Sequence, residues 1–507
     1  MESVWATLDA FTSGKAAARN KTQLDAAIKD HALAVSRLMS AHREVVDANT
    51  RDILQVRLPI GFFIILLTLK PQRLDPSTDS IAFLAILLSS LELSTPPSDI
   101  DRSSLLDETL RFLLAFDTLQ IRYVGSSLRK LLEHVLTGRL FTPVVAVEAA
   151  ATAMLRIDPS GSMFTSTHLL LAKFAYTSTW VEPALKVLDR DITFFPGMAG
   201  QKDSKLLSDS SLTPAAYISV DTGLTEPVKS ATVLEYNLVS GLCYMARRDW
   251  VKSHRALERV ITHPSKDKGV SKIMDEAYKV WLLVGLLKDG KEPSLPAYTA
   301  QSAKNTFNTL GAPYKNVANQ FSTTNVGQLI AEIGANRQVW ADDGNEQLMV
   351  EVIAAYQKWQ IMNLRDIYKQ ISISQLRQAT LSAETGEILK DDDQATHLVR
   401  DMIDSGLLKG ELIMGNSGDD SYLLFHEDSN SLTEVEFAKE IALRHHNIES
   451  LGKQYHAANE RLSGSKEYVR HMVREQKRAE KDSGDPGVGF DSQIEDEDLM
   501  TGILANS

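Results

Sequence analysis

The sequence has little of what several common classes of protein require. Its 507 residues include one cysteine, Cys243. A single cysteine allows neither a disulfide within the chain nor a zinc site with several thiolate ligands, and it favours a reducing compartment over secretion. The N-terminus, MESVWATLDAF, lacks a charged segment followed by an apolar run. We therefore read no signal peptide.

Long apolar runs are also scarce. One very apolar run, LPIGFFIILLTL, occupies residues 58–69 and contains Pro59 and Gly61. Crossing a bilayer takes about 20 apolar residues, so this run is too short to span a membrane. We expect it to form a buried core helix, and we expect no membrane association.

An excess of positive charge is absent. The formal net charge is −12. The phosphates of nucleic acids and of anionic lipids would repel such a chain. The charge balance therefore disfavours a nucleic-acid or membrane partner and suits a protein that binds other proteins.

Residue patterns that support catalysis are missing as well. No His-x-His pair, which a zinc isopeptidase requires, occurs in the sequence. His445 and His446 are adjacent and point about 100° apart on a helix, while His446 and Glu449 supply only two ligands. Cys243 lies between apolar neighbours and is predicted to be a packing residue. No Gly-rich phosphate loop is present. We expect no enzyme, no metal site and no cofactor.

What the sequence does contain, up to about residue 340, is one helical pattern after another. Two stretches share a spacing in which two small residues lie twelve apart and a leucine follows four later: Ala172, Ala184 and Leu188, then Gly241, Ser253 and Leu257. Small residues at facing positions let two antiparallel helices approach closely, and Pro196 and Pro264 are predicted to end the second helices. These stretches resemble tetratricopeptide repeats. The prediction is a mostly α fold built on a helical-repeat solenoid.

The pattern changes between residues 345 and 425. A long helix is predicted to begin at Asn345 and to break near Asn363, with its apolar face continuing to Ile371. Ser372 and Gln375 fit a capping box, so a second helix is expected from Ser372 to about Thr380. A third helix follows the sequence DDDQ and is expected to end near Gly406, where glycine suits a left-handed conformation.

After Gly406 the apolar period shortens to two, which is typical of strands. Leu408, Gly410 and Leu412 alternate with more polar residues, and a second strand is predicted at Tyr422–Phe425. Three helices followed by a β-hairpin is the order of a winged helix. Its third helix would enter the major groove of DNA. That helix and its cap are acidic, which leaves nucleic-acid binding as a minor alternative: Asp391, Asp392, Asp393, Asp401 and Asp404.

Helical repeats leading into a winged helix resemble the PCI family. The residues that carry the resemblance are YQKWQIMNLRDIYKQISISQL, MIDSGLLKGEL and YLLFHED. The family includes subunits of the proteasome lid, the COP9 signalosome and translation initiation factor three. Residues 164–192 and the sequences HLVRDMIDSGLL and LLFHED are most similar to signalosome subunits. The likeness runs from about residue 164 to about residue 462, and Pro196–Ser230 is interpreted as an insertion.

The resemblance implies a non-catalytic scaffold in a complex that removes the ubiquitin-like protein Nedd8 from cullins. Its partners would be other PCI-type subunits and metal-bearing, isopeptidase-like subunits, with cullin-RING ligases contacted indirectly. A subunit of the proteasome lid or of initiation factor three is the alternative within the family. An unrecognised hydrolase is the alternative from another class.

Two partner-binding sites are predicted. The first is the strand Tyr422, Leu423, Leu424 and Phe425, expected to be an outer strand with free backbone groups. The second is a helix after the winged helix, whose apolar residues repeat at spacings of four and three with Arg444 as an interruption: Phe437, Ile441, Ile448, Leu451, Tyr455, Ala458 and Leu462. Such a heptad-like seam predicts bundling with helices of partner subunits, with packing on its own domain as the alternative.

These patterns predict four regions. Residues 1–230 are expected to form N-terminal helical repeats, and residues 231–430 a PCI domain with a helical part at 231–344 and a winged helix at 345–430. Residues 431–480 are assigned to the bundling helix. Residues 481–507 are acidic and poor in apolar residues, which predicts disorder.

Overall fold

A computed structural model describes most of the chain. The described residues are 20–48, 74–92, 99–196, 206–264, 269–323, 325–414, 421–426, 434–464, 466 and 468–474. They fall into two compact units, Met1–His426 and Glu427–Ser507. The apolar run at 58–69 and the acidic tail at 481–507 lie outside the described residues, so the predictions made for them stay predictions.

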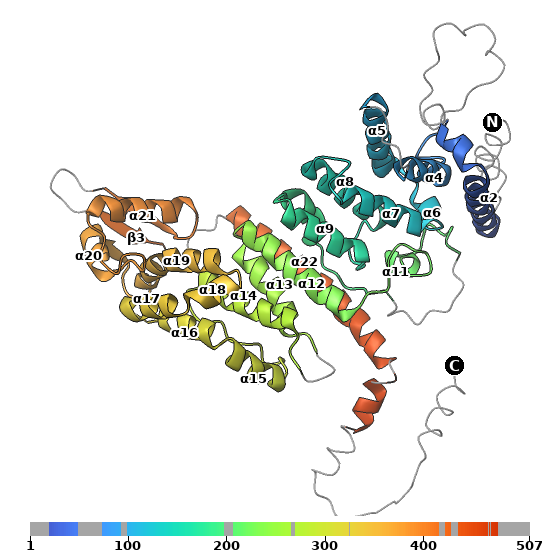
Figure 1. Cartoon of the computed structure of the whole chain (residues 1–507). Coiled ribbons are helices and arrows are strands. Elements are labelled where there is room, and N and C mark those ends of the chain that lie inside the picture. Colours follow the sequence, from blue (N-terminus) through green and yellow to red (C-terminus); the bar gives the residue numbers. More distant parts are fainter. Residues whose placement is uncertain are drawn as a thin grey trace, which may run out of the picture. The chain divides into compact units, whose positions relative to one another are not determined.

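The first half of the larger unit is a set of helices around one hydrophobic core (Figure 1). Its elements are α2 (Lys21–Ala48), α4 (Ser80–Leu91), α5 (Asp99–Ala115), α6 (Thr118–Ile121), α7 (Gly125–Val135), α8 (Pro143–Ile157), α9 (Ser166–Thr177), η1 (Glu182–Ala184), α10 (Leu185–Leu188) and α11 (Pro214–Tyr217). Helix α8 is rich in alanine, and several of its alanines are fully buried against neighbouring helices. Small side chains there let the helices pack closely.

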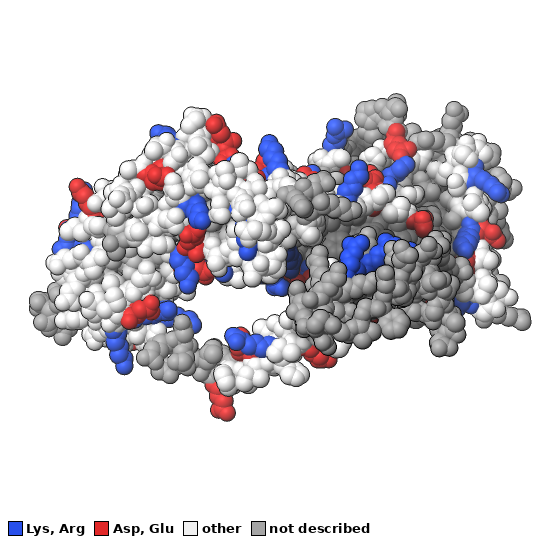
Figure 2. Space-filling view, turned by 90° about the horizontal axis from the view of Figure 1, so that it is seen from below, with Lys and Arg blue, Asp and Glu red and all other residues white. Residues whose placement is uncertain are grey.

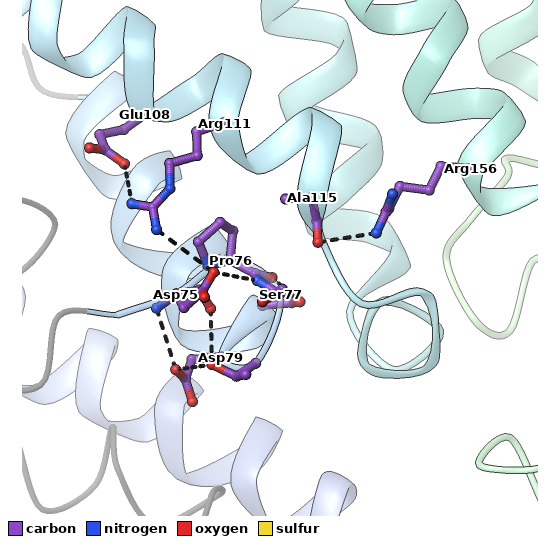
Figure 3. Close-up of polar contacts among 10 residues, drawn as sticks. Asp75, Pro76, Ser77, Asp79, Glu108, Arg111, Ala115 and Arg156 are labelled. Carbon is purple, nitrogen blue, oxygen red and sulfur yellow. Dashed lines mark hydrogen bonds and ion pairs between the residues drawn. The ribbon is translucent and has the colours of Figure 1, made fainter.

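Arginines close the ends of the first helices (Figure 3). The Arg156 side chain on α8 donates to the carbonyls of Leu114 and Phe116 at 3.0 and 2.7 Å. It also donates to the carbonyl of Ala115 at 3.2 Å, the bond that Figure 3 draws. These carbonyls end α5 and have no partner within their own helix, so a cation there satisfies them and complements the helix dipole. Arg111 likewise lies between Glu108 and the turn before α4.

The second half of the larger unit continues the series of helices around a second core. Its elements are α12 (Ser230–Ala246), α13 (Trp250–Ile261), α14 (Lys272–Asp289), α15 (Gln301–Leu310), α16 (Ala312–Phe321), α17 (Val326–Ala335), α18 (Arg337–Asp342) and α19 (Glu346–Leu364). Helix α12 contributes side chains to both cores and packs on α9 as well as α13. The predicted fold, mostly α with helical repeats, is confirmed.

The two repeats share a turn as well as a spacing. Thr179 and Arg248 are the non-glycine residues with positive φ in the described chain, at 65° and 58°. Each lies seven residues after the small residue of the first helix in its repeat. Thr179 N–H donates to the Tyr176 carbonyl at 3.1 Å, and Arg248 N–H donates to the Met245 carbonyl at 2.8 Å. Left-handed residues are rare outside glycine, so their recurrence at one repeat position indicates a common turn.

The predicted contact between small residues is present in the second repeat. Ser253 Oγ on α13 donates to the Gly241 carbonyl on α12 at 2.9 Å. A Cβ atom on Gly241 would lie 2.9 Å from Leu257 Cγ, closer than atoms pack. The spacing of Gly241, Ser253 and Leu257 therefore reflects a close approach of the two helices.

We expect Gly241→Val to lower the free energy of unfolding of the larger unit by about 1–3 kcal/mol, because the branched side chain must displace Leu257. Thermal unfolding followed by calorimetry measures this change. Ala246→Val, at the exposed end of the same helix, is the matched control and should change stability by less than about 0.5 kcal/mol. Equal effects of the two substitutions would contradict the close approach.

One expectation about the first repeat is wrong. The second helix ends at Leu188 rather than at Pro196, because Phe194 forms a bridge to Met163 and the chain there runs extended beside the start of α9. The segment Pro196–Ser230, interpreted as a loop or insertion, is irregular over its described part except for the short helix α11, as a loop should be, although Tyr217, Ile218 and Leu224 are buried.

The end of the larger unit is the predicted winged helix, with a third core. After α19 come β1 (Gln370–Ser372), α20 (Ile373–Ala379), α21 (Asp392–Asp404), β2 (Gly410–Ile413) and β3 (Tyr422–Phe425). Ser372 Oγ accepts from the Gln375 N–H at 3.2 Å, as an N-cap should. Gly406 has a φ of 72° just after α21. The predicted capping residue and the predicted left-handed glycine are confirmed.

Candidate interaction site

The first predicted site, Tyr422–Phe425, has a different position in the sheet of the winged helix from the one that the sequence predicts. Its strand order is β1-β3-β2, with both pairings antiparallel. Strand β3, which holds Tyr422, Leu423, Leu424 and Phe425, is therefore the central strand. The prediction that it is an outer strand with free backbone groups is wrong, because β1 pairs with its second side.

Side chains of β3 alternate between two environments. Leu423 and Phe425 point into the core and are 0% and 5% exposed. Tyr422 points outward, is 39% exposed and pairs across the sheet with Ile413 of β2, which is 43% exposed. Of the predicted residues, Leu423 and Phe425 are core residues, whereas Tyr422 remains available to a partner. The edge strands are β1 and β2, and of the two β2 is the more exposed.

The second predicted site lies on α22 (Glu434–Ser463) in the smaller unit. Phe437, Ile441, Ile448, Leu451, Tyr455 and Leu462 are 50–68% exposed. At about 100° per residue these positions fall within an arc of about 80° along one side of the helix. We call these six residues the seam. A row of large apolar side chains facing solvent is unfavourable unless a partner covers it.

The groups that carry chemistry offer no alternative site in the described part of the chain. No cluster of three or more His, Cys, Asp and Glu side chains that could hold a metal is found there. Cys243 is fully buried, and burial raises the pKa of its thiol to about 12, so it is not a thiolate nucleophile at neutral pH. Among the described helices, none has the length and apolar character that crossing a bilayer demands.

The charges of the described residues do not gather into a basic groove on the face that Figure 2 shows. On the face seen in Figure 2, residues of both signs are interspersed among uncharged ones. Asp392, Asp393, Asp401 and Asp404 of α21 are exposed. Arg377 pairs with Asp392 at 2.6 Å. The helix that would enter a major groove therefore presents carboxylates to the phosphates.

Sequence reasoning missed β1 and the buried histidine of α9. The Nδ1 of His168 accepts from the Thr165 N–H at 3.1 Å and completes the N-terminal cap of α9. The spacing T-x-x-H, a threonine three residues before a polar side chain, was the signal available for it.

The larger unit matches a known family of helical repeats. A family model described as "COP9 signalosome complex subunit 3, N-terminal helical repeats" matches residues 65–209 and 212–303. The matched ranges cover all but residues 210 and 211 of the segment interpreted as an insertion. That segment is therefore part of the family's repeat region.

Two curated relatives extend the match. "COP9 signalosome complex subunit 3" of Neurospora crassa is 38% identical over 446 residues, which cover 86% of this chain and 90% of the relative. The protein of the same name from Emericella nidulans is 31% identical over 325 residues, covering 62% of this chain and 65% of the relative. The resemblance found in the sequence, within the PCI family, to subunit 3 of the signalosome is thereby confirmed. The chain belongs to the COP9 signalosome complex subunit 3 family.

Proposed function

We propose that the chain is a non-catalytic scaffold subunit of the COP9 signalosome, supporting removal of Nedd8 from cullin-RING ligases through protein–protein contacts. The observation that carries the proposal is the 38% identity to a curated subunit 3 across 90% of that protein. The names of the matched proteins favour the signalosome over the proteasome lid and initiation factor three.

In this proposal the partners are other PCI-type subunits and the metal-bearing, isopeptidase-like subunits of the same complex. Cullin-RING ligases are contacted indirectly, and the protein works in the cytoplasm and nucleus. The proposed regions are the N-terminal repeats (1–230), the PCI domain (231–430), the bundling helix (431–480) and the acidic tail (481–507).

Two surfaces are proposed to hold the subunit in place. The seam of α22 is the main anchor, because its exposed apolar side chains would each stabilise an interface by about 1.5–3 kcal/mol when fully buried. The edge strand β2 is the second surface, since an edge strand can extend its sheet into a neighbouring subunit. Outward-facing Tyr422 and Ile413 lie beside the β2 edge.

An add-back experiment tests the proposed function. The other signalosome subunits are prepared without this one, and the full chain is then added. We expect the chain alone to show no turnover of a Nedd8–cullin conjugate, and we expect it to enter the complex on size-exclusion chromatography. Turnover by the chain alone that chelation abolishes, or failure to join the complex, would contradict the proposal.

A further inference from the structure

Arg444 is the single charged residue inside the seam of α22. The seam residues flank it at intervals of three and four, and at about 100° per residue it lies near the middle of the apolar arc. In the structure its side chain is 74% exposed, and its Nε donates to the Glu440 carboxylate at 2.8 Å. Any partner that covers the seam would therefore also cover the guanidinium of Arg444.

Burial of that guanidinium constrains the partner. Arginine stays protonated when buried, so its charge must be matched within the interface. Glu440 lies just outside the apolar arc of α22, and its carboxylate accepts a hydrogen bond from the Nε of Arg444. The N–H donors at Nη1 and Nη2 would need acceptors in the interface, and an all-apolar partner would leave them unsatisfied.

We propose that Arg444 is a specificity-determining residue, which selects a partner helix carrying a carboxylate within an otherwise apolar seam and fixes the register of the two helices. The proposal rests on the proposed role of the seam as an anchor. A single polar residue in an apolar seam fixes register because only one alignment pairs it. The occupant is thus an acidic–apolar helix of another signalosome subunit.

The chain offers a matched control on the opposite side of α22. Lys453 pairs with Glu449 at 2.9 Å, also with the acid four residues before the base. At about 100° per residue it lies about 180° from Arg444. The Arg444–Glu440 and Lys453–Glu449 pairs therefore differ in their position relative to the seam while sharing spacing, direction and exposure to solvent.

The test compares affinities of full-length variants for the signalosome subunits assembled without this chain. Arg444→Met should weaken binding by at least about tenfold, because the partner carboxylate is left buried without its cation. Lys453→Met should change it by less than about twofold. Glu440→Gln should cost less than Arg444→Met, because Glu440 is not the main partner.

Each other outcome has a definite meaning. If Arg444→Met binds as tightly as the unmodified chain or more tightly, Arg444 is a tolerated interruption and the inference is overturned. If Glu440→Gln weakens binding as much as Arg444→Met, the charge is matched within α22 and the inference is again overturned. Replacing Ile448 and Leu451 by Asp shows whether only the inference about Arg444 is wrong or whether the proposed role of the seam as an anchor is wrong too. If they detach the chain, the proposed role of the seam survives. If they do not, both proposals fall.

Discussion

A chain carrying Ile448→Asp and Leu451→Asp is expected to melt normally but to lose its place in the complex. Both side chains are exposed, at 68% and 58%, so neither substitution empties a core. Covering them in an interface would be worth about 3 kcal/mol or more in total, and the new carboxylates would also have to be desolvated. We therefore expect affinity for the remaining subunits to fall by more than about a hundredfold.

The matched control uses apolar side chains of α22 that lie outside the seam. Val435 and Leu443 are 64% and 55% exposed, and Val435→Asp with Leu443→Asp makes the same change in side-chain type. This variant should bind within about threefold of the unmodified chain. A seam variant that melts early yet still joins the complex would mean that the helix packs on its own domain.

Acidification between pH 6.5 and 4 is expected to destabilise the larger unit strongly. Burial lowers the pKa of several of its histidines, and two of these have the largest shifts. His168 is 4% exposed, and burial lowers its pKa to about 4, although Asp158 opposes the shift. His254 is 8% exposed and stacks on Trp281. Burial, with a smaller contribution from Lys288, lowers its pKa to about 4 as well, against Glu258 and Asp289.

The sign of the effect follows from proton uptake. An unfolded histidine has a pKa of about 6.5, so between pH 6.5 and 4 the unfolded chain binds more protons than the folded chain. The stability contributed by each neutral imidazole is complete above pH 6.5 and is lost as the pH falls toward 4. From pH 7.5 to pH 5 the loss is about 2 kcal/mol per histidine, or about 4 kcal/mol for both.

Variants that keep the packing but cannot titrate test this prediction. His168→Gln retains an acceptor for the Thr165 N–H, as in a capping box, and His254→Phe retains the stack on Trp281. The double variant should lose about 4 kcal/mol less than the unmodified chain between pH 7.5 and pH 5, measured by urea unfolding. An unaltered slope in the double variant would show that other groups cause the acid sensitivity.

Local signals were enough to predict much of the winged helix. The cap at Ser372 and the left-handed Gly406 each depend on neighbouring residues, and both are confirmed. Strand β1 has three residues and exists because it pairs with β3, about fifty residues later. No local pattern contains that pairing, so the strand was read as the end of a helical face and β3 was read as an outer strand.

The two predicted interaction sites differ in the same respect: one depends on a local pattern and the other on contacts between distant segments. The spacing of the seam is a local property of one helix, so the sequence alone defined it, and its residues are exposed as a partner-binding face requires. The position of Tyr422–Phe425 within the sheet depends on contacts between distant segments, and the sequence misplaced it. The repeats were predicted from small residues such as Gly241, whereas the recurring turn at Thr179 was not, because threonine gives no local signal for a left-handed conformation.

The most direct test of the scaffold proposal is purification of the tagged full-length chain from its own cells, followed by identification of the co-purifying proteins by mass spectrometry. The account predicts the other COP9 signalosome subunits in a constant ratio to the chain, and their loss when Ile448 and Leu451 are replaced by Asp. Recovery of the chain without those subunits, or with the subunits of the proteasome lid or of initiation factor three in their place, would contradict it.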